Sequence, residues 1–219
     1  PRADIGGALA DPETGKVQAY AVTYLKPEWH VLDASIKGDL DFLRAKFGDD
    51  FGIQSRTRAD DKWIVGVGGP TRPGEAWLYD RAAKRLTRLY VTRPELASVP
   101  LAPMIPLELK ARDGLTLVSY LTLPPGADSK GAGRPDHPLP LVLVVHGGPW
   151  ARDGYGYNSL HQFLANRGYA VLSVNFRGST GLGKNFIAAA DHEWGGKMQD
   201  DLIDAVAWAV KQGVAERGK

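Results

Sequence analysis

The chain has 219 residues, of which 43% are hydrophobic and 24% are charged, and its formal net charge is +2. Because lysine and arginine are scattered, neither nucleic acid nor an anionic membrane is expected as a partner. Cysteine is absent, which excludes disulfides and thiolate metal sites within the chain. No apolar stretch approaches transmembrane length, and the compartment, cytoplasmic or periplasmic, stays open.

The first hundred residues favour short strands joined by polar turns. Residues 17–24 are aromatic and β-branched, as strands prefer, and residues 32–47 carry apolar side chains at helical intervals before a glycine. A further strand is expected over 63–67, and a hairpin over 75–80 and 86–91. This pattern indicates a sandwich or a propeller blade, and no internal repeat decides between them.

The segment from Ser98 to Pro106 contains three prolines and is expected to be a semi-rigid linker. After it, residues 107–110 and 115–123 alternate apolar and polar positions around a turn at 112–114. Such a turn between alternating segments predicts a β-hairpin.

From residue 139 onward, strand and helix signals alternate. We expect a strand over 139–145, a helix over 158–167, a strand over 169–175, a glycine-rich turn over 177–183 and a helix over 198–211. This β-α-β-α order predicts a parallel sheet covered by helices on both faces.

The strand over 139–145 ends abruptly in His146-Gly147-Gly148-Pro149. The glycines allow a sharp turn whose backbone N–H groups carry no side-chain cover. In hydrolases, an HGG-type turn after such a strand donates a backbone N–H to an oxyanion. Gly147 and Gly148 are therefore the candidate oxyanion-hole residues, with a tight turn of no catalytic part as the alternative.

Five stretches of the second half follow one another in a characteristic order. They are Ala111-Arg-Asp-Gly-Leu115 with Tyr120-Leu-Thr-Leu-Pro124, Val144-Val-His-Gly-Gly-Pro-Trp150, Gln162-Phe-Leu-Ala-Asn-Arg-Gly-Tyr-Ala-Val-Leu172, Asn175-Phe-Arg-Gly-Ser-Thr-Gly-Leu-Gly183, and Trp194-Gly-Gly-Lys197 before Asp200-Asp201. Together they resemble the start of the catalytic α/β-hydrolase domain of the prolyl oligopeptidase family of serine peptidases. The acylaminoacyl-peptidase and dipeptidyl-peptidase-like branch is the most similar.

The resemblance implies that residues 1–104 are the C-terminal blades of a β-propeller and that residues 105–219 are the first, incomplete part of an α/β-hydrolase domain. In the family, the catalytic serine lies in a Gly-x-Ser-x-Gly elbow after the strand that follows the helix over 198–211, and Asp and His come later. We therefore expect the triad to be absent, both ends to be cut from a longer polypeptide, and the chain alone to be inactive.

The partners that the resemblance implies are a short peptide substrate and the remainder of the catalytic domain, and a homo-oligomer is compatible with it. No cofactor is implied. No His, Asp and Glu set shows zinc-ligand spacing, so no metal is expected.

Two polar residues of the glycine-rich turn are candidates of different kinds. Ser179 lies between glycines, but Arg177 stands where the nucleophile elbow needs glycine, so Ser179 is expected to line the turn rather than to attack substrate. Arg177 either contacts a substrate carboxylate or carbonyl, or forms an ion pair with Asp191 or Glu193.

Aromatic residues follow the HGG turn. Trp150, Tyr155 and Tyr157 either form a wall of the substrate pocket or pack under the loop, and Trp150 and Tyr155 are kept as candidate substrate-binding residues. His146 is a general base in principle, although a structural bond to loop backbone is favoured.

The leading hypothesis is a serine-type peptidase that releases acyl-amino acids or dipeptides through an acyl-enzyme, with this chain supplying the oxyanion-hole loop. An esterase or lipase-like α/β-hydrolase is the first alternative, because HGG turns occur there too; the β-rich first half argues against it. The second alternative is a non-catalytic chain of a split or nicked assembly.

Overall fold

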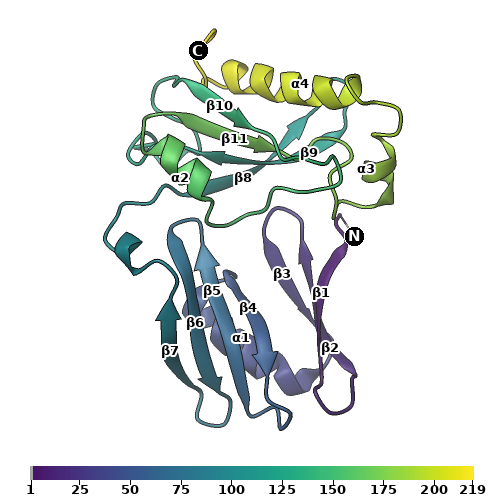
Figure 1. The fold of residues 1–219 in the computed structure, drawn as a ribbon, viewed down its shortest axis with the longest axis vertical. Helices are drawn as coiled ribbons and strands as arrows, with labels where there is room; N and C mark the ends of the chain where they lie inside the picture. Colours follow the sequence, from purple (N-terminus) through teal and green to yellow (C-terminus); the bar gives the residue numbers. More distant parts are fainter. Residues whose placement is uncertain (1) are drawn as a thin grey trace.

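The computed structural model describes residues 2–219, which fold into two stacked parts (Figure 1). Two antiparallel sheets form the lower part of the view, and one mixed sheet with helices on both faces forms the upper part. In chain order the elements are β1 (Ile5–Ala10), β2 (Val17–Thr23), β3 (Pro27–Val31), α1 (Lys37–Phe47), β4 (Phe51–Arg56), β5 (Lys62–Gly69), β6 (Arg72–Asp80), β7 (Arg85–Val91), β8 (Met104–Lys110), β9 (Thr116–Thr122), β10 (Leu141–Val144), α2 (Ser159–Ala165), β11 (Ala170–Val174), α3 (Lys184–Ala188) and α4 (Lys197–Lys211).

The lower part has a three-stranded sheet, β1-β2-β3, and a four-stranded sheet, β4-β5-β6-β7, each an antiparallel meander. Burial alternates along β5, as the two-residue period of a pleated strand requires, and its Trp63 and Val65 share a core with Leu40 of α1. The expected strands and hairpin of this half are confirmed. Sheets of this kind fit β-propeller blades.

The helix expected over 32–47 begins later than expected, at Lys37. A short 3-10 turn, Ala34–Ile36, precedes it because the carboxylate of Asp33 accepts the N–H of Ser35. The cap thus uses the residues that the apolar spacing had assigned to the helix.

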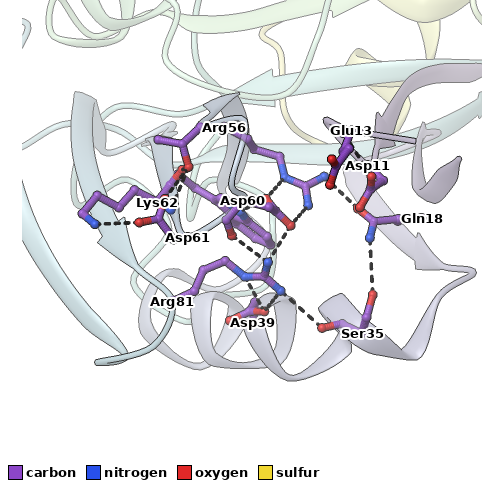
Figure 2. Close-up of polar contacts among 12 residues, drawn as sticks. Asp11, Glu13, Gln18, Ser35, Asp39, Arg56, Asp60, Asp61, Lys62 and Arg81 are labelled. Carbon is purple, nitrogen blue, oxygen red and sulfur yellow. Dashed lines mark hydrogen bonds and ion pairs between the residues drawn. The ribbon is translucent and has the colours of Figure 1, made fainter. Parts of the chain in front are cut away.

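A polar network fastens α1 to two turns of the four-stranded sheet (Figure 2). Arg81 donates to the Asp39 carboxylate at 3.0 and 2.8 Å and to the Asp60 carboxylate at 2.5 Å. Burial alone would raise the pKa of Asp39, but hydrogen bonds from Lys84, Tyr79 and Arg81 keep that pKa below its usual range. Asp39 is therefore negatively charged and holds α1 against the four-stranded sheet.

The upper sheet has the order β10-β11-β9-β8. β10 and β11 are parallel, whereas β9 pairs antiparallel with both β11 and β8. The expected parallel pairing of the strands after residue 139 and the expected hairpin around 112–114 are both confirmed, and the hairpin joins the same sheet by antiparallel pairing of β9 with β11. Helices do cover both faces, with α4 on one and α2 on the other (Figure 1).

The expected linker over 98–106 is shorter than predicted, because β8 already begins at Met104. Pro106 lies inside β8 opposite Tyr120. A proline, which has no N–H to donate, is tolerated there because β8 is an edge strand.

The loop between β10 and α2 makes non-covalent contacts between the two parts. Arg152 donates to the carbonyls of Thr23 and Tyr24 at 2.8 and 2.6 Å, and the ammonium of Lys26 lies 4.8 Å from the ring centroid of Tyr155. The loop that follows the HGG turn consequently rests on the β2–β3 turn.

Candidate oxyanion-binding site

The HGG turn leaves the carboxyl end of β10, where ligands bind in open α/β sheets. Gly148 has φ +131°, and a Cβ on it would come within 2.6 Å of the Trp150 backbone nitrogen. Only glycine fits this conformation and this space. The local sequence therefore folds into a turn with an exposed backbone edge.

The imidazole of His146 orients one peptide of the turn. Its Nδ1 lies 2.9 Å from the carbonyl oxygen of Gly147. The Gly147–Gly148 peptide is trans, so the Gly148 N–H points in the opposite direction to that carbonyl. Neither the Gly147 nor the Gly148 N–H donates to an acceptor among residues 2–219, and of these two glycines Gly148 is the one that lines the pocket beside the turn.

An open pocket of about 290 Å³ lies beside the turn. Its lining is mainly apolar and comes from the ends of β10 and β11 and from the start of α4. The lining residues are His146, Gly148, Pro149, Phe176, Trp194, Gly195, Met198, Gln199 and Leu202. Trp194 and Met198 received no role from the sequence, since neither belongs to a reactive pattern, and only the fold places α4 against the turn.

Ser179 is brought to His146, with 2.9 Å between its Oγ and the imidazole Nε2. That distance is typical of a nucleophile and its base, but the side chain of Ser179 is fully buried and its Oγ lies 2.6 Å from the carbonyl of Phe176. Within the described range 2–219, no carboxylate is hydrogen-bonded to this ring, whose Nδ1 faces the Gly147 carbonyl. The geometry fits the expectation that Ser179 does not attack substrate.

Arg177 is buried, with 4% of its side chain exposed. Its guanidinium donates to Asp201 at 2.9 and 2.7 Å and to Asp113 at 2.9 and 3.1 Å, and the pairing lowers the pKa of Asp113. The ion-pair alternative is thus right in kind but wrong in its partners, which are not Asp191 or Glu193. A substrate contact of Arg177 gains no support, since both edges of the guanidinium are occupied.

The positions of Asp200 and Asp201 near the start of the expected helix indicate a role in helix capping and in complementing the helix dipole. The carboxylate of Asp201 instead lies fully buried and also accepts the backbone N–H of Arg177 at 2.9 Å. Asp200, in the first turn of α4, pairs with Arg112 at 3.0 Å. The helix therefore presents one acid inward and one outward.

The three aromatic candidates diverge. Trp150 is 61% exposed, and its ring centroid lies 6.1 Å from that of Trp194 at the pocket. The ring centroid of Tyr155 lies 6.4 Å from that of Tyr120, and Tyr155 lines a different cavity between the two parts. Tyr157 lies under the guanidinium of Arg93. Of the three, only Trp150 neighbours the HGG turn in space.

His161 is a buried polar residue whose contacts sequence reasoning did not foresee. Its ring nitrogens lie 2.9 Å from the hydroxyls of Thr122 and Ser173, and burial lowers its pKa to about 4. The side chain is therefore neutral and structural at neutral pH.

Across residues 2–219, no three His, Asp or Glu side chains gather as metal ligands would. Within the same described range, every helix is too short or too polar to cross a membrane.

Comparison with known proteins identifies the family to which a chain with these features belongs. The profile of the prolyl oligopeptidase family matches residues 155–219. Dipeptidyl aminopeptidase BIII of Pseudoxanthomonas mexicana is 58% identical over 213 residues, covering 97% of this chain and 31% of that protein. Dipeptidyl peptidase family member 6 of Caenorhabditis elegans is 38% identical and matches 100% of this chain and 32% of its own length.

This chain belongs to the prolyl oligopeptidase family. Among solved structures, an acylaminoacyl peptidase of Pyrococcus horikoshii superposes with a TM-score of 0.68 at 20% identity, covering 99% of this chain and 32% of that one. This likeness extends the family fold over both parts of the chain. The chain spans about a third of the length of these relatives.

Proposed function

We propose that this chain is part of a serine peptidase that releases dipeptides from short peptides, and that it supplies the oxyanion-binding loop. The observation that carries the proposal is the N–H of Gly148 at the carboxyl end of β10, which meets no acceptor among residues 2–219 and belongs to a residue that lines the pocket. A backbone donor in such a place is what an acyl-transfer site needs. Residues 1–104 would be propeller blades, and residues 105–219 would begin the catalytic domain.

In the proposed reaction, a serine hydroxyl outside residues 1–219 adds to the scissile carbonyl carbon. The carbonyl π electrons move onto oxygen, and the Gly148 N–H donates to the resulting oxyanion. A general base takes the proton of the serine hydroxyl during the addition; collapse then breaks the C–N bond, the amine leaves with that proton, and water hydrolyses the acyl-enzyme that remains. A preorganised donor stabilises this oxyanion without reorganisation, and the loss of one such donor lowers kcat by about 10²–10³.

The family relatives favour a substrate with a free amino terminus. The relative at 58% identity is named a dipeptidyl aminopeptidase, whereas the acylaminoacyl peptidase at 20% identity supports the fold alone. We therefore place dipeptide release ahead of acyl-amino-acid release. Trp150 and Trp194, beside the pocket, would contact the substrate.

The test compares three substrates on the complete protein: a dipeptide p-nitroanilide, an N-acetyl-amino-acid p-nitroanilide and a p-nitrophenyl ester. We expect the free dipeptide anilide to have the highest kcat/KM. Turnover of the ester alone would replace the proposal by an esterase, and preference for the acetylated anilide would replace dipeptide release by acyl-amino-acid release.

The role of Gly148 is tested by Gly148→Ala, which should lower kcat on the anilide by about 10²–10³. Gly114→Ala is the matched control, because Gly114 also has a positive φ (+87°) but lies in the β8–β9 turn with open space around it. A Gly148→Ala variant as active as Gly114→Ala would refute the assignment of this amide. Residues 1–219 alone should turn over none of the substrates.

A further inference from the structure

We propose that Arg152 is a positioning residue of the oxyanion site, because it ties the HGG loop to the β2–β3 turn of the lower part. The inference rests on the proposed function of the Gly148 N–H and gives the lower part a role in the chemical step. Arg152 belongs to the loop between β10 and α2 and follows Gly148 by four residues. The two residues are joined by a short stretch of chain, so a shift of one displaces the other.

The guanidinium of Arg152 joins backbone segments from both parts of the chain. Its Nη1 donates to the carbonyl of Thr23 at 2.8 Å and to that of Gly181 at 3.4 Å, and its Nη2 donates to the carbonyl of Tyr24 at 2.6 Å. Thr23 and Tyr24 lie where β2 ends, whereas Gly181 lies in the glycine-rich turn that follows β11. A planar fork of N–H donors is suited to bridging several oxygens at once.

These bonds connect backbone segments rather than neutralise a charge. The Nε–H of Arg152 has no partner and its other nitrogens meet only carbonyl oxygens, so no carboxylate pairs with it among residues 2–219. The Gly181 carbonyl also accepts the N–H of Asp4, just before β1, at 3.0 Å. A Cβ on Gly181 would lie 2.8 Å from Nη1 of Arg152. The guanidinium is therefore enclosed between the lower part and the glycine-rich turn.

The backbone next to Arg152 rests on the same glycine-rich turn. The carbonyl of Ala151 accepts the N–H of Thr180 at 3.0 Å. Gly148 has no side chain whose packing could fix the orientation of its own peptide. The direction of its N–H therefore depends on the chain segments on either side, and Arg152 anchors the segment on the carboxyl-terminal side.

Replacement of Arg152 by methionine in the complete protein tests the inference. Methionine keeps an unbranched apolar stem and removes the hydrogen bonds to the three carbonyls. A displacement of about 1 Å can lower the rate about 10²-fold, so we expect kcat for the dipeptide anilide to fall about 10- to 100-fold. KM should change less than about twofold, because the amide binds an oxyanion that exists only beyond the ground state. An unchanged kcat, with or without a raised KM, would overturn the inference.

Arg152→Lys separates the bridging contacts from the charge. Lysine keeps the positive charge but has a single nitrogen in place of the fork, so this variant should recover only part of the lost kcat. It also serves as the test if Arg152→Met does not fold. Full kcat in Arg152→Lys would mean that the charge alone suffices and would contradict the bridging role.

Gln162→Met is the matched control. Gln162 lies on α2, at the other end of the loop. Its side-chain amide also donates to backbone carbonyls, to that of Pro70 in the lower part at 3.1 Å and to that of Ala102 in the linker at 2.8 Å. This variant should loosen the contact between the two parts but keep kcat at the parent value. An equal fall of kcat in Arg152→Met and Gln162→Met would identify general loosening as the cause and refute the inference.

A double-mutant cycle separates this inference from the proposed function. If Arg152 acts through the Gly148 N–H, Arg152→Met should lower kcat in the parent protein but have little further effect in Gly148→Ala. Equal losses in both backgrounds would remove the positioning role of Arg152 and leave the oxyanion role of Gly148 in place. If Gly148→Ala keeps full activity, the proposed function fails, and the inference that rests on it fails with it.

Discussion

Replacement of Arg177 by methionine tests whether this residue is structural. Methionine keeps the length and the apolar stem of the side chain but removes the guanidinium. Asp201, which is fully buried, would then lose the partner that donates to it at 2.9 and 2.7 Å. The variant leaves a buried carboxylate whose remaining donor is the backbone N–H of residue 177.

The magnitude follows from the burial of each partner. Removing one member of a buried pair typically costs about 3–5 kcal/mol, and the side chains of Arg177 and Asp201 are 4% and 0% exposed. The second pair is different, because the side chain of Asp113 is 39% exposed and a solvated pair contributes about 0–1 kcal/mol. We therefore expect Arg177→Met to cost about 3–5 kcal/mol and Asp113→Asn at most about 1 kcal/mol.

The assay is amide hydrogen exchange of β11 and α4, because a chain of two parts is not expected to unfold in a single step. The double variant Arg177→Met/Asp201→Asn removes the uncompensated charge and retains an oxygen that accepts the backbone N–H. It should recover more than half of the lost protection. A loss of stability below about 1 kcal/mol in Arg177→Met, together with a raised KM, would contradict the structural role. It would indicate instead that Arg177 contacts the substrate.

Two further predictions concern buried ionisable groups. Burial lowers the pKa of His161 to about 4 in the folded chain, so the unfolded chain takes up the proton first as pH falls below about 6.5. The free energy of unfolding should therefore decrease by about 3 kcal/mol between pH 6.5 and 4. Thermal unfolding at a series of pH values should show this dependence in the parent protein and not in His161→Gln. Asp39→Asn should lower the free energy of unfolding of the four-stranded sheet and α1 by about 2–3 kcal/mol. Asp41→Asn, on the exposed side of the same helix, should change that free energy by no more than about 0.5 kcal/mol. Equal unfolding free energies of the two variants would contradict the anchoring role of Asp39.

Several elements follow from local sequence alone. The aromatic and β-branched composition of β2, the short strand signal of β5, the hairpin at 112–114 and the α4 helix each depend on neighbours within the element, and their expected positions are confirmed. The strands missed by sequence reasoning, β1, β3 and β4, have weaker local signals. β1 contains two glycines, for example, and is a strand because β2 pairs with it.

The sequence by itself determined the family and the HGG turn, because both are carried by consecutive residues whose order is diagnostic. Only the tertiary structure decided how the turn is held, since the imidazole Nδ1 of His146 lies 2.9 Å from the Gly147 carbonyl oxygen. It likewise decided that Arg177 is bound by Asp113 and Asp201, residues 64 and 24 positions away. Partners so distant along the chain are chosen by the packing of α4 and the β8–β9 turn around β11, and spacing in the sequence carries no record of that choice.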